Sequence, residues 1–409
     1  MTTFKMGKYK PYVWKGINKW GQKATGVIVA EEDAAAEHEA RTLGITIHYL
    51  QQRSLWMLPG KADRKIKIID IVFIMRQLST LLTAGVPLVH SLEIISSGAE
   101  KVKLRAMLLT IRDDIANGRT FAEAITPYPQ FFNALICGLI NSGEQSGTLD
   151  KMVNEVANYL EYHEYLKSRI KRALYYPITV LSVAIIVCIS MLVFLVPRFE
   201  KIYASFNAKL PGFTLAVVSL SHHLRENWWL ILIVLAVIFY LFRQLRQTSN
   251  GFNRFLDRLA IRIILFGPIV QKAIISRICS TLSITLVAGI PLIDALNRVA
   301  KVANNQLFRD ALLQTREQVV QGESISLAMR GTLMFPPMVS QMVEIGEKSG
   351  SLDHMLSKVG EYYREQVDSS VEGLTTLIEP LLIVTIGIIV GIFVFAMYLP
   401  IFNLGLVIK

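Results

Sequence analysis

The sequence contains little cysteine. Only Cys137, Cys188 and Cys279 occur in its 409 residues. An odd number of cysteines, none of them in a Cys-x-x-Cys pair, does not form a disulfide framework or a cysteine-rich metal site. We therefore expect most of the chain to fold in a reducing compartment.

Charged residues are also scarce. They make up 18% of the chain, against 52% for hydrophobic residues, and the mean hydropathy is +0.41. Soluble globular proteins carry about 25% charged residues, and disordered chains are less apolar than this one. Yet the charge is too high for a protein that lies wholly in lipid. The composition predicts a few apolar segments with soluble domains between them.

Motifs for bond chemistry are missing. The chain has no Walker A, GxGxxG, GxSxG or HExxH pattern, and these are common signatures of nucleotide-binding and hydrolytic sites. The neighbouring His222 and His223 lack the further ligands that a metal site needs, so we interpret them as interfacial residues. We expect no enzyme activity, no catalytic residue, no cofactor and no metal site.

Acidic residues are outnumbered by basic ones, which gives a formal charge of +11. Such an excess is typical of nucleic-acid contact or of cytoplasmic flanks of membrane spans. Here the basic residues cluster at the ends of apolar runs and in residues 1–23, which hold six lysines and no acid. Because no aromatic stacking positions are interleaved with them on one face, we expect no nucleic-acid partner.

Three uncharged runs predict transmembrane helices. Residues 177–196 and 380–399 each hold 20 residues without a charge, which as helix spans about 30 Å, the thickness of the hydrocarbon core. Residues 228–242 form a shorter run that begins with two tryptophans, which suit a membrane interface. The expected boundary residues are Pro177, Pro197, Trp228, Trp229, Glu379, Pro380 and Pro400.

The distribution of basic residues orients these spans. Lysine and arginine residues gather just before the first run, within residues 1–176, and just after the second run, within residues 243–379. The positive-inside rule therefore places both parts in the cytoplasm. The loop 197–227 and the tail 400–409 then lie on the outer side. No apolar run follows the basic N-terminus, so we expect no signal peptide.

The sequence contains an internal duplication. Residues 74–88 match residues 278–292 at eight of 15 positions, and GEQSGTLD at 143–150 matches GEKSGSLD at 346–353 at six of eight. Matching residues of the two copies are 204 positions apart in the first part of the repeat and 203 positions apart in the second part. Because the matching segments keep the same order and spacing, chance is a poor explanation. Each copy is a soluble domain followed by a membrane helix, and the middle span returns the chain to the same side.

The expected fold class is mainly α. Apolar residues recur at helical spacing through 68–172 and 273–379, which predicts two homologous helical bundles of about six helices each. In each copy, a glycine can end one helix and a proline two residues later can open the next. These repeat turns hold Gly85 and Pro87 in the first copy, and Gly289 and Pro291 in the second.

The other parts of the chain have different patterns. Short strand-like runs at 9–15, 25–30 and 45–49 around a helix at 31–43 predict a small basic α/β domain over residues 1–55. Two connecting segments complete the expected organisation: a linker at 56–67 and a basic connector at 243–272.

The repeated GExSG motifs leave two interpretations open. As a structural turn, glycines end one helix, Thr148 or Ser351 caps the next, and an aspartate in its first turn opposes the helix dipole. The glutamates are less well explained, and could form salt bridges, meet a basic partner or bind a cation. The candidate contact or turn residues are Gly143, Glu144, Gly147, Asp150, Gly346, Glu347, Gly350 and Asp353.

Several segments together resemble a known family. They are residues 12–30, 76–88, 171–178, 196–214, 378–384 and 395–405, together with both GExSG motifs. The sequence resembles the inner-membrane platform proteins of type IV pilus assembly and type II secretion, the type II secretion system protein F family. The ending FAMYLPIFNLG is more similar to the pilus branch.

The resemblance implies a function that the residues alone do not. It implies a bacterial inner-membrane platform that couples a hexameric cytoplasmic secretion ATPase to pilin extraction and to fibre assembly or retraction. The implied partners are this ATPase, pilins, inner-membrane alignment proteins and further copies of the chain. The alternatives are the platform of a type II secretion system, a transport permease subunit, or a membrane-tethered nucleic-acid binder.

Overall fold

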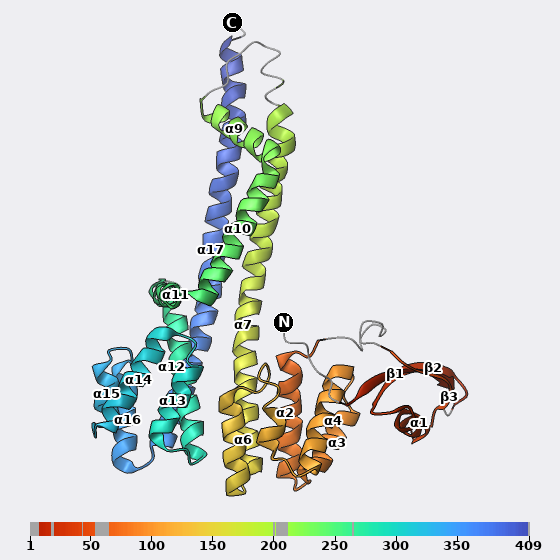
Figure 1. Cartoon of the computed structure of the whole chain (residues 1–409). Coiled ribbons are helices and arrows are strands. Elements are labelled where there is room, and N and C mark those ends of the chain that lie inside the picture. The colour runs from red at the N-terminus through yellow and green to blue at the C-terminus, as the bar shows by residue number, and fades with distance from the viewer. Residues whose placement is uncertain are drawn as a thin grey trace.

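The computed structural model describes residues 8–17, 20–42, 44–53, 65–198, 201, 212–263 and 266–407. These residues form a small sheet domain, two helical bundles and a stalk of long helices (Figure 1). Residues 54–64, which make up most of the expected linker, lie outside the described part.

The N-terminal domain is a three-stranded antiparallel sheet with one helix. Strand β1 (Lys10–Ile17) lies between β2 (Lys23–Ala30) and β3 (Thr46–Gln52), and α1 (Asp33–Thr42) packs on one face. The expected α/β pattern is therefore confirmed, with strand bounds that differ by a few residues.

The other face of this sheet packs on the first bundle at α4 (Val102–Ala116). At the edge of this contact, Asp113 accepts hydrogen bonds from the Tyr9 hydroxyl and, at 2.6 Å, from the Arg112 guanidinium. Burial favours the neutral acid, but these bonds and one from Lys8 outweigh it and hold the pKa of Asp113 below its ordinary value.

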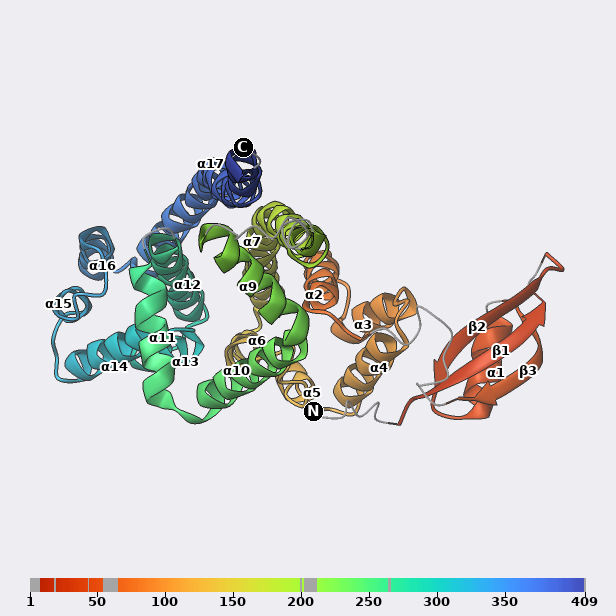
Figure 2. The ribbon, with the colours of Figure 1, turned by 90° about the horizontal axis from the view of Figure 1, so that it is seen from above.

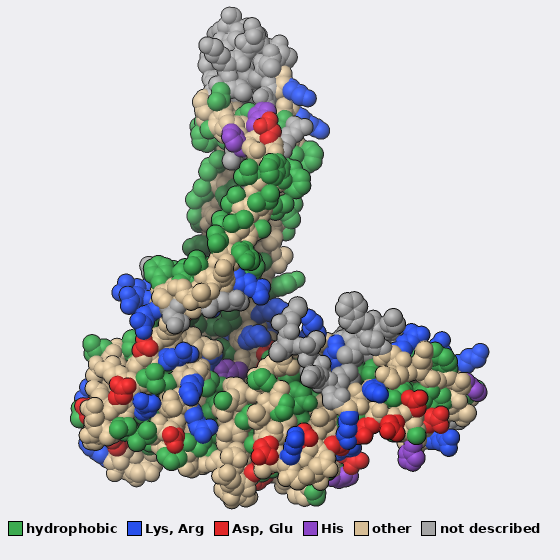
Figure 3. Space-filling model, in the orientation of Figure 1, with side chains coloured by type: hydrophobic (Ala, Val, Ile, Leu, Met, Phe, Trp, Pro, Cys, Tyr) green, Lys and Arg blue, Asp and Glu red, His purple; other side chains and the backbone are tan. Residues whose placement is uncertain are grey.

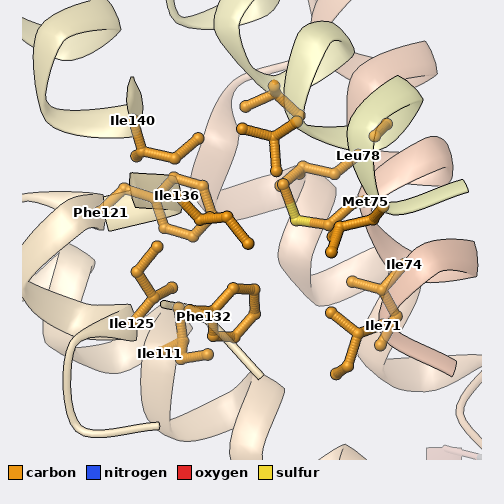
Figure 4. Close-up of a cluster of buried hydrophobic side chains, with 14 of the residues drawn as sticks. Ile71, Ile74, Met75, Leu78, Ile111, Phe121, Ile125, Phe132, Ile136 and Ile140 are labelled. Atoms are coloured by element: carbon orange, nitrogen blue, oxygen red, sulfur yellow. The ribbon is translucent and has the colours of Figure 1, made fainter. Parts of the chain in front are cut away.

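The first bundle has one apolar core (Figure 4). Ile71, Met75 and Leu78 of one helix are buried against Phe121 and Ile136 from the opposite side of the bundle. Its helices are α2 (Ile68–Thr83), α3 (Leu88–Ser97), α4, α5 (Phe121–Ile125), α6 (Ala134–Ser146) and α7 (Leu149–Ser190).

The second bundle repeats this arrangement around Ile275, Leu282 and Phe308. Its helices are α12 (Gly267–Val287), α13 (Leu292–Val302), α14 (Gln306–Val320), α15 (Ile325–Gly331), α16 (Pro337–Ser349) and α17 (Leu352–Val407). The mainly α fold class and the two bundles of about six helices are confirmed.

The stalk is built from helices that begin inside the bundles. Helix α7 continues through a π-helical segment, η3 (Met191–Leu195), and α17 runs unbroken from the second bundle. Helix α10 (Trp228–Thr248) returns from the far end of the stalk to its base (Figure 1), and Figure 3 shows hydrophobic side chains over the stalk with charges gathered at its base. The expected C-terminal tail is helical as far as Val407.

The expected outer loop contains a helix that our sequence analysis missed, α9 (Gly212–Glu226). Its Ser221 Oγ donates to the carbonyl of Leu192 at 2.5 Å, and its Thr214 Oγ1 donates to the carbonyl of Ala396 at 2.9 Å. Val218 packs between the same two long helices. Helix α9 therefore joins the far ends of α7 and α17.

Among the described residues, four helices are long and apolar enough to cross a membrane. Three contain the expected spans, and the fourth is α12. In α12, 56% of the most apolar stretch is buried in the protein, against 6% in α7 and α17. Its apolar side chains, such as Cys279 and Leu282, face the core of the second bundle, which accounts for them without a membrane.

Candidate functional site

The two GExSG motifs fold into the same turn. Gly147 follows α6 and Gly350 follows α16, and both have a φ of 70°, a left-handed conformation that glycine adopts without strain. The next residue donates its N–H to the motif's first glycine, Thr148 to Gly143 at 2.8 Å and Ser351 to Gly346 at 3.0 Å. Such bonds satisfy carbonyls at the end of a helix.

The first glycine of each motif lies where the long helix passes closest. A Cβ at Gly143 would lie 2.6 Å from Cγ of Met152, and a Cβ at Gly346 would lie 2.9 Å from Cα of Leu352. Real side chains do not approach so closely, so both positions exclude any larger residue.

The motif glutamates are used inside the bundles. Glu144 accepts the N–H groups of Phe121 and Ala122 at 2.6 and 3.0 Å. Glu347 accepts the N–H of Ile325 at 3.1 Å. These donors lie in the first turns of α5 and α15, where no helical acceptor exists and a negative charge is favourable. The geometry favours the structural interpretation of the motif over a cation site.

One expected cap is wrong. Thr148 is the residue before α7, but its side chain makes no hydrogen bond to that helix. Its Oγ1 lies 2.7 Å from Oγ of Ser146, as Oγ of Ser351 lies 2.6 Å from that of Ser349. Asp150 and Asp353 lie in the first turns of their long helices, where a carboxylate opposes the helix dipole.

The repeat turns also have one geometry, but their surroundings differ. Gly85 and Gly289 have φ values of 80° and 74°, and Pro87 and Pro291 directly precede the next helices. The first turn is exposed, whereas beside the second, Ala288 accepts a hydrogen bond from Oγ of Ser142 in the first bundle at 2.5 Å. This turn therefore belongs to the contact between the bundles.

The expected boundary residues lie on the stalk, away from both GExSG turns. Trp228 and Trp229 are exposed at the start of α10, and Glu379 is exposed in α17. The four boundary prolines interrupt no helix; they are Pro177, Pro197, Pro380 and Pro400. The structure therefore does not gather the predicted residues into one site.

A second candidate site lies where α7 meets α12 and α17. The Arg364 guanidinium stacks on the Tyr162 ring, 3.8 Å from its centroid, and Arg169 forms an ion pair with Asp368 at 2.8 Å. Our sequence analysis singled out none of these residues. A signal was present, because basic residues precede the first span while acidic residues alone precede the third.

A cavity of about 820 Å³ opens at this junction. It is lined by His163 of α7, Arg277 of α12 and Arg364 of α17, among others. Burial, helped by the charges of both arginines, lowers the pKa of His163 to about 3, so this imidazole is neutral at pH 7.

Among the described residues, no group of three or more His, Cys, Asp or Glu side chains is placed to hold a metal.

Comparison with known proteins matches both copies of the repeat. The family described as type II secretion system (T2SS), protein F, matches residues 74–197 and again 278–400. Type IV pilus assembly protein TapC of Aeromonas hydrophila is 41% identical over 392 residues, which cover 96% of this chain and 95% of that protein.

Two further relatives represent both named systems. Type IV pilus assembly protein PilC of Pseudomonas aeruginosa is 43% identical over 345 residues, which cover 84% of this chain and 92% of that protein. Type II secretion system protein F of Vibrio cholerae is 30% identical over 343 residues, which cover 84% of each chain. On the two matched repeats and these relatives, the chain belongs to the type II secretion system protein F family.

Proposed function

We propose that the chain is a non-enzymatic inner-membrane platform of a type IV pilus machine. In this role its two bundles lie in the cytoplasm and contact a hexameric secretion ATPase, while the stalk contacts pilins and alignment proteins in the membrane. The higher identity to pilus assembly proteins than to the secretion protein supports the pilus branch.

One observation carries the proposal. Helices α7 and α17 each begin inside a soluble bundle and run without a break into an apolar stretch. A force on either bundle therefore reaches the apolar part through continuous helix. A pure docking scaffold would not need this continuity, whereas coupling of a motor to pilin extraction does.

The test is to soften α7 between bundle and stalk. Four glycines inserted after Lys171 should abolish surface pili in a strain that lacks its own copy, because each glycine weakens a helix by about 1 kcal/mol. The protein level and its membrane insertion should stay normal. The matched control places four glycines between Thr248 and Ser249, where α10 already ends. Wild-type piliation with the softened α7 would contradict coupling through this helix.

A second candidate is the equivalent platform of a type II secretion system. The Vibrio cholerae relative supports it. The same two insertions then apply, with export of a secreted protein as the readout in place of pili.

A further inference from the structure

Two arginines without an acidic partner line the cavity of about 820 Å³ at the junction. They are Arg277 of α12 and Arg364 of α17, and these helices lie side by side with α7 when viewed along the stalk (Figure 2). The Nε atom of each is buried, and no described residue accepts a hydrogen bond from it. Arg105 and Arg316 also have such an atom, but each pairs with a glutamate. Among the described residues, neither cavity arginine forms an ion pair.

Five carboxylates also line the cavity, but they do not neutralise these arginines. Three are paired with cations elsewhere: Glu161 with Arg76 at 2.6 Å, Glu361 with Lys358 at 2.9 Å, and Asp368 with Arg169 at 2.8 Å. Of the other two, Glu155 has its pKa raised by burial, which favours the neutral acid, and Asp353 opposes the helix dipole in the first turn of α17. The groups whose charges act on Arg277 are Tyr159 and Tyr162, not carboxylates.

Both arginine charges reach one point of the cavity. That point is His163 of α7, because both Arg277 and Arg364 help to lower its pKa. A neutral imidazole keeps one N–H donor, and Ser280 and Ser357 carry hydroxyls on the same lining. The cavity therefore combines positive potential with several hydrogen-bond donors. A buried charge that lacks a partner within the chain is costly, so an anion from outside would stabilise it.

We propose that this cavity binds the phosphate group of an anionic ligand. The planar guanidinium of arginine matches the oxygens of a phosphate and donates two hydrogen bonds to it. Small-molecule sites have volumes of about 300–1,000 Å³, so the cavity holds a phosphate together with part of the molecule that carries it. A lipid headgroup and a soluble phosphate ester share this chemistry. The lining extends along α7 to Tyr165, which precedes the expected first span.

The bound ligand would touch both bundles. Tyr159 and His163 belong to the long helix of the first bundle, whereas Arg277 and Arg364 belong to the second. A phosphate held by the two arginines against α7 therefore stabilises the observed contact between the bundles. This inference rests on the cavity and does not depend on the proposed pilus function.

The first experiment measures inorganic phosphate binding to the full chain in detergent. The melting midpoint of the wild type should rise with phosphate and not with sodium chloride at equal ionic strength. Arg277→Gln and Arg364→Gln should each weaken the apparent affinity about tenfold or more, because each removes a hydrogen bond to a charged group. Without phosphate, Arg277→Gln should melt no lower than the wild type, since it removes a buried unpaired charge.

The matched control is Arg330→Gln, which removes an exposed arginine of α15. It should bind phosphate as the wild type does. Equal weakening in this variant and in the two cavity variants would assign the effect to general screening of the basic chain and overturn the proposal.

The second experiment distinguishes the source of the phosphate. Delipidated full chain is mixed with phosphatidylglycerol or phosphatidylcholine, and native mass spectrometry counts the lipids that it retains. If the source is a lipid, the wild type should retain more phosphatidylglycerol than Arg277→Gln and Arg364→Gln do. A difference with inorganic phosphate alone would identify a soluble ligand. If neither probe distinguishes the wild type from both cavity variants, the proposal is wrong.

Discussion

Glu144 and Glu347 hold equivalent positions in the two bundles, and each binds the first turn of a short helix. The neighbouring glycines, Gly147 and Gly350, were predictable from the local sequence, because a glycine between two helical patterns commonly ends the first helix. The partners of the glutamates were not predictable in this way. Phe121 lies 23 residues from Glu144, and only the folded bundle brings them together.

Replacement of Glu144 by alanine should therefore destabilise the first bundle. It removes two hydrogen bonds to otherwise unpaired N–H groups, and loss of a helix cap costs about 1–2 kcal/mol. A lower melting midpoint of the full chain in detergent is expected, with a similar effect for Glu347→Ala. Glu93→Ala is the control, because Glu93 is exposed and its carboxylate lies 3.4 Å from the exposed His90. An unchanged midpoint with lost pili would restore the contact interpretation.

At the scale of elements, helices were more predictable than the ends of helices. Spacing of apolar residues predicted both bundles, because their cores repeat every three to four residues. The helix α9 was missed because its sequence, GFTLAVVSLSHHLRE, follows a proline, begins with glycine and lacks a long uncharged run. The boundary prolines were expected only to bracket the spans, and the structure keeps them within continuous helix, because a proline at the start of an apolar stretch can be held within a helix by its surroundings.

Helix α11 (Asn250–Arg262) follows the end of α10 and lies over the second bundle, against α12 and α14 (Figures 1 and 2). It carries three arginines, and its Phe255 and Leu259 are exposed. A basic helix with an exposed apolar face is typical of the membrane interface. We expect a polarity-sensitive dye at Phe255→Cys to shift to shorter wavelength when the chain is reconstituted into anionic vesicles.

The control for α11 is the same dye at Ile293→Cys, an exposed apolar residue in the first turn of α13, which follows the far end of the 21-residue α12. Its emission should not change on reconstitution. Equal emission from both positions would show that α11 stays in water.

On the scale of the whole molecule, the duplication predicted two bundles on one side, but not how they meet. The junction depends on pairs such as Tyr162 with Arg364 and Arg169 with Asp368, which are about 200 residues apart in the chain. No local pattern specifies such pairs. The opposite charges before the first and third spans were the only trace of them in the sequence.

The junction should weaken in mild acid. His163 is held neutral in the folded chain, with a pKa of about 3 against 6.5 for the free side chain. Below pH 6.5 the unfolded chain binds a proton that the folded chain does not, so stability falls as pH falls, by up to about 1.4 kcal/mol per pH unit. The melting midpoint should drop between pH 7.5 and pH 5.5.

The variant His163→Phe keeps an aromatic ring beside Tyr159, which His163 meets edge-on at 4.4 Å, and removes the titrating group. Its midpoint should change less over the same range. His90→Phe, at an exposed position of α3, should leave the pH dependence intact. Equal losses in the wild type and His163→Phe would assign the acid sensitivity to other groups.

Helix α9 gives the stalk a property that neither long helix has alone. The two helices are tied at the base by Arg169 and Asp368 and at the far end by Ser221 and Thr214 of α9. Together they form a closed four-sided frame. Such a frame holds the two helices against splaying apart at either end.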